Sequence, residues 1–363
     1  MTDSTLPRKI LMTADAVGGV WTYALDLARG LAPEGVQFTI ATMGPRPTPA
    51  QKRDAGHLPN VSLVESDYRL EWMEEPWNDV DAAGEWLGQL AADLAPDLIH
   101  LNGYAHAARH WPAPVLVAAH SCVLSWWRAV RGMRNPEEWN EYRRRVARGL
   151  QAADFVVAPT RAMLATLGDN YGDLPRLGVI PNGRDARKFR AARKEPFVFS
   201  AGRFWDESKN LSALEKAAGR ISWPVRVAGS DEEHNALVSL GKLSPDAVAD
   251  ELSRATIFCL PARYEPFGLS ALEAAFSGCA LVLGGIASLR EVWEDAALFV
   301  DPDDSTALAG ALQQLISDPE RQRQLAQRAQ RQAQRYGLQA MAERYLSLYR
   351  GLTRQAQLVK EAA

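Results

Sequence analysis

The stretch RYEPFGLSALE, residues 263–273, combines a turn, the start of a helix and two carboxylates eight positions apart. Pro266 and Gly268 favour a turn, and the residues from Ser270 onward predict a helix that begins just beyond it. The apolar run at 256–260 predicts a strand that leads into the turn. Glu265 is therefore expected at the carboxyl end of a strand, and the second carboxylate about two turns into the helix.

The turn is a candidate phosphate site. The first N–H groups of a helix have no partner within the helix, so the amides around Phe267, Gly268 and Leu269 are expected to be available to a phosphate. A phosphate cradle flanked by Glu265 and Glu273 would suit a sugar attached to a nucleoside diphosphate. A surface turn with two solvated glutamates explains the same residues, so the rest of the chain has to decide.

Size and composition narrow the choice of protein class. The chain has 363 residues, which suits two domains, and is 47% hydrophobic and 23% charged, as in ordinary globular proteins. No apolar run spans a bilayer, and the first residues lack the apolar core of a secretion signal. The three cysteines have neither a zinc spacing nor a disulfide pattern, so we expect a protein of the reducing cytoplasm. A net charge of −3 gives no support for nucleic-acid binding.

Short apolar runs alternate with helical patterns along the whole chain. The predicted strands are 9–13, 37–41, 98–101, 115–119, 154–158 and 178–180, followed by 197–201, 225–228, 256–260 and 280–283. This alternation predicts α/β architecture, with parallel sheets covered by helices on both faces. Residues 181–185, together with the charged stretch that follows them to Glu195, are interpreted as the linker.

Glycines and cations follow the first strand of each half. Gly18 and Gly19 precede a predicted helix, where they would let a ligand approach its first amides, although a plain tight turn explains them equally. The full Gly-x-Gly-x-x-Gly pattern is absent, which disfavours a nicotinamide site. Arg203 and Lys209 are expected at the carboxyl edge of the second sheet, where their charges would suit phosphate oxygens. Ordinary surface cations are the alternative.

His120 ends an apolar strand and is a candidate for a contact with substrate, although a core histidine is an equal alternative. No cluster of His, Cys and acidic residues has a metal spacing, so no metal site is predicted. The acidic residues at 301–304 lie between a predicted strand and a helix, where they are expected to cap the helix.

Together these features resemble the family-four glycosyltransferases with the GT-B fold over most of the chain. The supporting strings are DFVVAPTR (154–161), VIPNG (179–183), Arg203 with Lys209-Asn210, EPFGL (265–269) with Glu273, and Glu291-Val with ALFV (297–300). The loop GGIASLRE (284–291) is a longer version of the family's Gly-Gly-x-x-Glu.

The resemblance implies two doubly wound, Rossmann-like α/β domains that face each other across a cleft. An acceptor domain would occupy residues 1–185 and a nucleotide-sugar domain residues 195–335, with a helix at 336–352 crossing back to the first domain. Gly18 and Gly19 would bring the first domain's backbone to the diphosphate. Members of the family transfer a hexosyl unit with retention at the anomeric carbon. They need no metal ion or other cofactor beyond the nucleoside-diphosphate sugar.

The resemblance also assigns roles to single residues. Arg203 and Lys209, with the helix start after Gly268, would take the place of a metal on the leaving diphosphate. Glu273 would bind the ribose, and Glu265 would orient hydroxyls of the donor sugar. His120 would hydrogen-bond the transferred sugar. No residue is assigned as a general base, since in this family the leaving phosphate is thought to take the acceptor's proton.

Aromatic residues near the carboxyl edge of the first sheet are candidates for acceptor binding. They are Trp21, Tyr23, Tyr104, Trp126 and Trp127, whose rings would pack against a sugar unless they belong to the core.

A basic stretch at 128–148 holds seven arginines and three glutamates. It would suit either a solvated helix or an anionic membrane surface. We therefore expect a sugar or glycoside acceptor, with a lipid-linked acceptor and peripheral membrane contact as the second choice. A sugar-nucleotide epimerase of the same fold, a nicotinamide oxidoreductase and a non-catalytic sugar-nucleotide-binding partner remain as alternatives.

Overall fold

The computed structural model describes residues 6–232 and 234–362. Contacts divide the chain into two compact units. The first contains residues up to Ser125, Arg134–Asn182 and the chain from Leu338 onward, and the second contains Trp126–Met133 and Gly183–Gly337.

Each unit is built on one parallel sheet. In the described part of the chain, the first sheet has seven strands in the order β3-β2-β1-β4-β5-β6-β7, and the second has six in the order β10-β9-β8-β11-β12-β13. The strands of the first sheet are β1 (Lys9–Asp15), β2 (Gln37–Met43), β3 (Val61–Glu65), β4 (Leu98–Leu101), β5 (Val115–Ala118), β6 (Phe155–Ala158) and β7 (Leu177–Val179). Those of the second are β8 (Glu195–Ala201), β9 (Val225–Ala228), β10 (Val238–Ser239), β11 (Ala255–Leu260), β12 (Ala280–Gly284) and β13 (Leu298–Val300).

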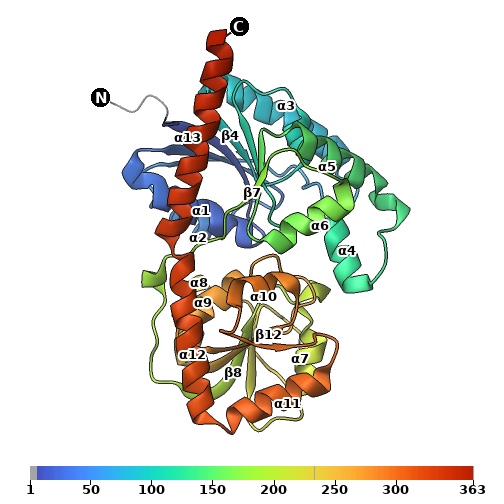
Figure 1. Cartoon of the computed structure of the whole chain (residues 1–363), viewed down its shortest axis with the longest axis vertical. Helices are drawn as coiled ribbons and strands as arrows, with labels where there is room; N and C mark the ends of the chain where they lie inside the picture. Colours follow the sequence, from blue (N-terminus) through green and yellow to red (C-terminus); the bar gives the residue numbers. More distant parts are fainter. Residues whose placement is uncertain (1–5, 233, 363) are drawn as a thin grey trace. The chain divides into compact units, whose positions relative to one another are not determined.

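Helices connect the strands and cover the sheets (Figure 1). Those of the first unit are α1 (Gly19–Leu31), α2 (Pro49–Gly56), α3 (Trp77–Leu94), α5 (Asn140–Ala152), α6 (Arg161–Tyr171) and α13 (Leu338–Ala362), and α4 (Val123–Arg131) begins there. Those of the second unit are α7 (Leu211–Ala218), α8 (Pro245–Arg254), α9 (Leu269–Phe276), α10 (Ala287–Trp293), α11 (Ser305–Ile316) and α12 (Pro319–Ala333).

Successive residues of each strand supply two different cores, because side chains alternate between the faces of a sheet. On β1, Leu11 packs with residues of α3 and α5, whereas Met12 packs with residues of α1 and α13. In the second sheet, Phe199 packs with α9, α10 and α12, and Val198 packs with α7 and α11. Both sheets are therefore sandwiched between helices, as Figure 1 shows for each unit.

Helix α13 packs against α1 in the first unit. At their contact, a Cβ on Gly30 would lie only 2.7 Å from the Cβ of Ala342, so a glycine allows the two helices to approach closely. Tyr345 and Tyr349 of α13 are buried in the same core. The helix runs to Ala362, well beyond the predicted end near residue 352.

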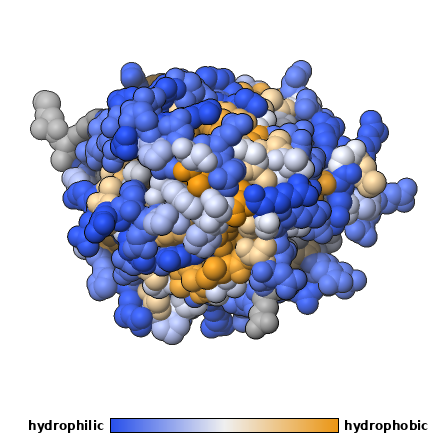
Figure 2. All heavy atoms as spheres, turned by 90° about the horizontal axis from the view of Figure 1, so that it is seen from below, coloured by the Kyte–Doolittle hydropathy of each residue, from blue (hydrophilic) through white to orange (hydrophobic). Residues whose placement is uncertain are grey.

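The predicted fold class is confirmed, with two doubly wound Rossmann-like units. The strand pattern did not predict β3 and β10 as strands. Both lie at sheet edges, where fewer residues are buried and the apolar signal is weaker. No helix in the described ranges is both long and apolar enough to cross a membrane, and hydrophilic residues predominate on the face drawn in Figure 2.

Candidate functional site

The strand order of the second sheet indicates where a ligand would bind in the second unit. Strands β8 and β11 are neighbours, and the chain turns from them toward opposite edges of the sheet. In doubly wound sheets, ligands bind at such a switch point, beyond the carboxyl ends of the strands. Lys209 follows β8, in the short 3-10 helix Glu207–Lys209, and Glu265 follows β11.

Lys209 and Glu265 form an ion pair at this edge. Lys209 Nζ donates to Glu265 Oε2 at 2.8 Å, and the two side chains are only 11% and 17% exposed. The second carboxylate oxygen, Oε1, accepts from the amide of Gly268 at 3.0 Å. Burial by itself would raise the pKa of Glu265, but the Lys209 ammonium and the Phe267 amide outweigh it and hold that pKa below its usual range. Glu265 is therefore ionised at neutral pH.

The turn that carries Glu265 depends on one glycine. Gly268 has φ +90°, and a Cβ there would lie 3.1 Å from Leu289 Cδ2. Helix α9 begins at Leu269, close to the predicted start. The amides of Phe267 and Gly268 point at the Glu265 carboxylate, which corrects the expectation that they are unoccupied and face a phosphate.

Arg203 lies close to the same pair. Its positive charge contributes to the low pKa of Glu265, and its guanidinium lies over the Trp205 ring at 5.4 Å from the ring centroid. The indole of Trp205 is 65% exposed. The structure thus brings together three of the predicted donor residues, Arg203, Lys209 and Glu265, at one edge.

Glu273 has a partner that the sequence did not reveal. Arg184 Nε lies 2.8 Å from Glu273 Oε1, with both side chains largely buried. Arg184 was assigned to the linker, but it belongs to the second unit and its guanidinium lies over the ring of Phe189. The sequence did not predict this pair, because a single arginine in a polar stretch does not indicate which distant residue it contacts.

Two further residues hold the turn and were missed for the same reason. Ser288 donates its hydroxyl to the carbonyl of Glu265 at 2.5 Å. Asn210, with φ +59°, donates through Nδ2 to the carbonyls of Pro261 and Pro302, and so links the segments that follow β11 and β13. Both contacts fix the backbone around Lys209 and Glu265.

In the first unit, His120 follows β5. Its Nε2 lies 2.8 Å from Asn102 Oδ1, and the edge of its ring faces Tyr23 at a centroid distance of 4.4 Å. Burial lowers the pKa of His120 to about 4, so the imidazole is neutral at pH 7. Helix α1 begins at Gly19, next to Gly18, and no side chain caps its first amides.

The predicted acceptor aromatics are only partly available. Trp21, Tyr23 and Tyr104 are 5%, 1% and 3% exposed and belong to the two cores of the first unit, so their assignment as acceptor-binding residues is wrong. Apolar rings beside a sheet satisfy the core first. Trp126 and Trp127 are partly exposed, and Trp126 donates its indole N–H to Asp206 Oδ1 at 2.9 Å.

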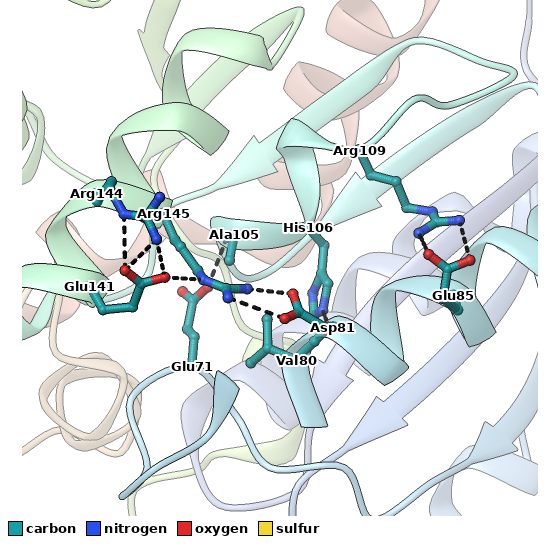
Figure 3. Close-up of polar contacts among 10 residues, drawn as sticks. All are labelled: Glu71, Val80, Asp81, Glu85, Ala105, His106, Arg109, Glu141, Arg144 and Arg145. Carbon is teal, nitrogen blue, oxygen red and sulfur yellow. Dashed lines mark hydrogen bonds and ion pairs between the residues drawn. The ribbon is translucent and has the colours of Figure 1, made fainter. Parts of the chain in front are cut away.

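A cavity lies in the first unit at the carboxyl ends of β1, β2 and β4. Its lining is Thr13, Ala14, Asp15, Met43, Arg69, Leu70, Glu71, Asn102, Gly103 and His106. The Glu71 carboxylate accepts from the amide of Tyr104 and from that of Ala105, and Figure 3 shows the contact with Ala105. Burial raises the pKa of Glu71 although these two hydrogen bonds oppose the shift. No predicted aromatic residue lines this cavity.

Several charged residues outside this site have structural partners. Asp304 accepts from the amides of Thr306 and Ala307 at the start of α11, so the predicted cap is confirmed. Arg144 pairs with Glu141, and Arg145 pairs with both Glu141 and Asp81 (Figure 3). Within the described ranges, no group of three or more His, Cys, Asp or Glu side chains is arranged to hold a metal.

Comparison with known proteins agrees with this architecture. Residues 17–188 match the model of Glycosyltransferase Family 4, and residues 182–332 match that of Glycosyl transferases group 1. The D-inositol 3-phosphate glycosyltransferase of Xylanimonas cellulosilytica is 27% identical over 94% of this chain and 93% of its own length. The glycogen synthase of Mycobacterium tuberculosis is 27% identical over 65% of this chain and 64% of its own.

Solved structures share the fold across both units. Sucrose-phosphate synthase from Thermosynechococcus elongatus has a TM-score of 0.83 at 20% identity, covering 96% of this chain and all of that one. The Anabaena protein HepE, solved in complex with UDP-glucose, has a TM-score of 0.76 at 18% identity, with 95% and 100% covered. The two matched models and the two Rossmann-like sheets place this chain in the family-four glycosyltransferases of the GT-B fold.

Proposed function

We propose that this glycosyltransferase moves a hexosyl unit from a nucleoside-diphosphate sugar to a hydroxyl of a sugar or glycoside, with retention at the anomeric carbon and without a metal ion. The observation that carries the proposal is the Lys209–Glu265 ion pair at the switch point of the second sheet, with Arg203 beside it. This edge offers cations for a diphosphate and a fixed carboxylate for a sugar.

The cations would act on the leaving group. A lysine ammonium has three N–H donors, and Glu265 takes one of Lys209's, which leaves two for phosphate oxygens. Arg203 adds a planar fork that suits a diphosphate. As the bond from the anomeric carbon to the phosphate oxygen breaks, negative charge grows on the diphosphate, and these fixed cations stabilise it. This is the role that a metal ion has in other transferases.

The two glutamates would have different partners in the donor. Glu265 is ionised and held by Lys209 and the turn, so it can only accept hydrogen bonds, which suits hydroxyls of the transferred sugar. Glu273, oriented by Arg184, would accept from the ribose hydroxyls. His120 would hydrogen-bond the transferred sugar.

In a transfer with retention, the bond that breaks and the bond that forms at the anomeric carbon lie on the same face of the sugar. The acceptor oxygen forms its bond to the anomeric carbon on the face that the diphosphate leaves, and the acceptor's proton passes to the leaving phosphate oxygen. This balances the reaction without a protein base.

We assign the acceptor to the cavity at the carboxyl edge of the first sheet. Its polar lining combines acceptors on Asp15 and Glu71 with the guanidinium donors of Arg69, which suits a polyhydroxylated molecule. The relatives named for inositol 3-phosphate and sucrose-phosphate make a sugar or polyol phosphate the first acceptor class to test.

A lipid-linked acceptor is the weaker proposal. Arg144 and Arg145 are paired with acidic side chains, and Arg143 donates to the carbonyl of Asn170 and to Asn135. These guanidinium groups are therefore partly neutralised or occupied within the protein, which leaves less charge for an anionic bilayer.

A thermal-shift panel with UDP, GDP and ADP tests the donor site first. A nucleotide at about 100 times its Kd should add about 2.7 kcal/mol of stability. The nucleotide that binds then sets the sugar donors, with UDP-glucose first because HepE was solved with it. Transfer to inositol phosphate, hexose phosphates, free sugars and glycolipid vesicles would be followed by NMR of the anomeric proton. An inverted product refutes retention, turnover of donor without any acceptor favours an epimerase, and binding without turnover favours a non-catalytic partner.

A further inference from the structure

Asn102 joins three strands of the first sheet through one side chain. It follows β4, with β1 on one side and β5 on the other. Its Nδ2 donates to the backbone carbonyl of Thr13 at 2.6 Å, and its Oδ1 lies 2.8 Å from Nε2 of His120. Its backbone amide donates to Thr13 Oγ1 at 2.9 Å. Both ends of the amide side chain are therefore engaged.

These contacts fix the direction of every hydrogen bond. A backbone carbonyl can only accept, so the group of Asn102 that faces Thr13 must be the NH₂, and its carbonyl oxygen must face His120. That oxygen also can only accept, so His120 must donate from Nε2. A neutral imidazole carries one N–H, which leaves Nδ1 with a lone pair.

His100, a buried neighbour of His120, has hydrogen-bond partners that do not impose a tautomer. Its Nδ1 lies 2.6 Å from the hydroxyl of Tyr349, and its Nε2 lies 3.2 Å from that of Tyr23. A hydroxyl can donate or accept, so neither tautomer of His100 is imposed. Asn102 gives His120 the constraint that His100 lacks.

The surroundings keep His120 neutral and leave Nδ1 available. The titratable groups that face it are Tyr23 of α1 and His100 of β4, and burial lowers the pKa of His120 to about 4. Among the residues that the structure describes, none hydrogen-bonds Nδ1. Asn102 and Thr13 also line the cavity of the first unit. The residues that fix the tautomer of His120 therefore border a candidate substrate site.

We propose that Asn102 is a positioning residue that holds His120 as the Nε2–H tautomer, so that Nδ1 accepts a hydrogen bond from a hydroxyl of the transferred sugar. The inference rests on the proposed function for the identity of that hydroxyl. The tautomer itself follows from Thr13, Asn102 and His120 alone.

Long-range ¹H–¹⁵N NMR on the full-length, ligand-free protein tests the tautomer at pH 7. A protonated ring nitrogen and a bare one have well-separated ¹⁵N shifts, and His120→Gln assigns the signals. The expected spectrum shows Nε2 protonated and Nδ1 bare. A proton on Nδ1, or a charged ring, overturns the inference. This experiment needs no substrate, so it is decisive even if no sugar is transferred.

Kinetics of Asn102 variants test the consequence. Asn102→Leu should release the tautomer and lower kcat about 10- to 100-fold, as for other residues that orient a working histidine. Asn102→Asp should keep the Nε2–H tautomer and near-normal kcat at high pH. It should lose activity as the pH falls through the raised pKa of His120, because Nδ1 then becomes protonated and no longer accepts.

Asn60→Leu is a matched control for the loss of a buried asparagine. Asn60 Nδ2 donates to the carbonyls of Ala28 and Val36, remote in sequence from this cluster. Its loss should reduce stability without altering the His120 spectrum or the pH profile. If transfer is measurable and Asn102→Leu leaves kcat unchanged, the inference is refuted while the proposed transferase activity stands.

Discussion

Replacing Lys209 by methionine separates the electrostatic role of the Lys209–Glu265 pair from simple packing. The variant keeps the length of the side chain and removes its charge, so the Glu265 carboxylate retains the amides of its own turn and the weaker influence of the Arg203 charge. Breaking a fully buried ion pair costs about 3–5 kcal/mol. Because these side chains are 11% and 17% exposed and the amides remain, we expect a loss of about 2–3 kcal/mol at pH 7.

The loss should depend on pH in a defined direction. In the native protein the pKa of Glu265 is lowered, so its stabilisation is present at neutral pH and is lost as the pH falls through that pKa. Without Lys209, burial dominates and raises the pKa of Glu265, so the destabilisation is greatest above that raised value. That part of the loss disappears as the pH falls below the value in the unfolded chain. The difference between the two proteins should therefore be largest at pH 7, smaller at pH 4, and absent only below the lowered pKa of Glu265 in the native protein.

Urea unfolding followed by circular dichroism at both pH values measures this difference. The double variant Lys209→Met/Glu265→Gln removes the stranded charge and should recover stability at pH 7, but not turnover. Turnover should fall on the order of 10²-fold in both variants, since a cation on the leaving diphosphate is lost.

Lys194→Met is the matched control in the same unit. Lys194 Nζ donates to the carbonyls of Ser277 and Leu252, so its loss should lower stability with little effect on turnover. An equal loss of stability for Lys209→Met at pH 4 and pH 7, or a double variant no more stable than the single one, would refute the electrostatic argument.

Three further outcomes are expected. Glu273→Ala should raise the donor KM more than it lowers kcat, because a ribose contact is made equally in the ground and transition states. Glu265→Gln should mainly lower kcat. Steady-state kinetics that show the same pattern for both variants would contradict this division of roles. Gly268→Ala should cost about 1–2 kcal/mol in urea unfolding, because φ is +90° there, and an unchanged midpoint would argue against that backbone conformation. Turnover should persist in excess EDTA, and a loss that Mg²⁺ restores would show that Arg203 and Lys209 do not replace a metal.

The alternation of apolar runs and helical patterns was sufficient to predict the two parallel sheets. Strands such as Val115–Ala118 and Ala280–Gly284 are buried on both faces, so their sequence is apolar throughout and their limits are clear. Edge strands such as Val61–Glu65 bury less, and their signal is lost among polar residues. Local sequence also located the turn at Gly268 and the cap at Asp304, because turns and caps depend on residues a few positions apart.

The partners of the site residues were decided by tertiary structure alone. Arg184 meets Glu273 across 89 positions, and Asn102 meets His120 across 18, through strand order that no local pattern encodes. Tyr23 and Tyr104 have aromatic rings of the kind that pack against sugars. Both are nevertheless buried, because burial of a large ring in the core is more favourable than its exposure to solvent. The sequence thus determined which chemical groups are present at each strand end, and packing determined which of them face a ligand and which hold one another.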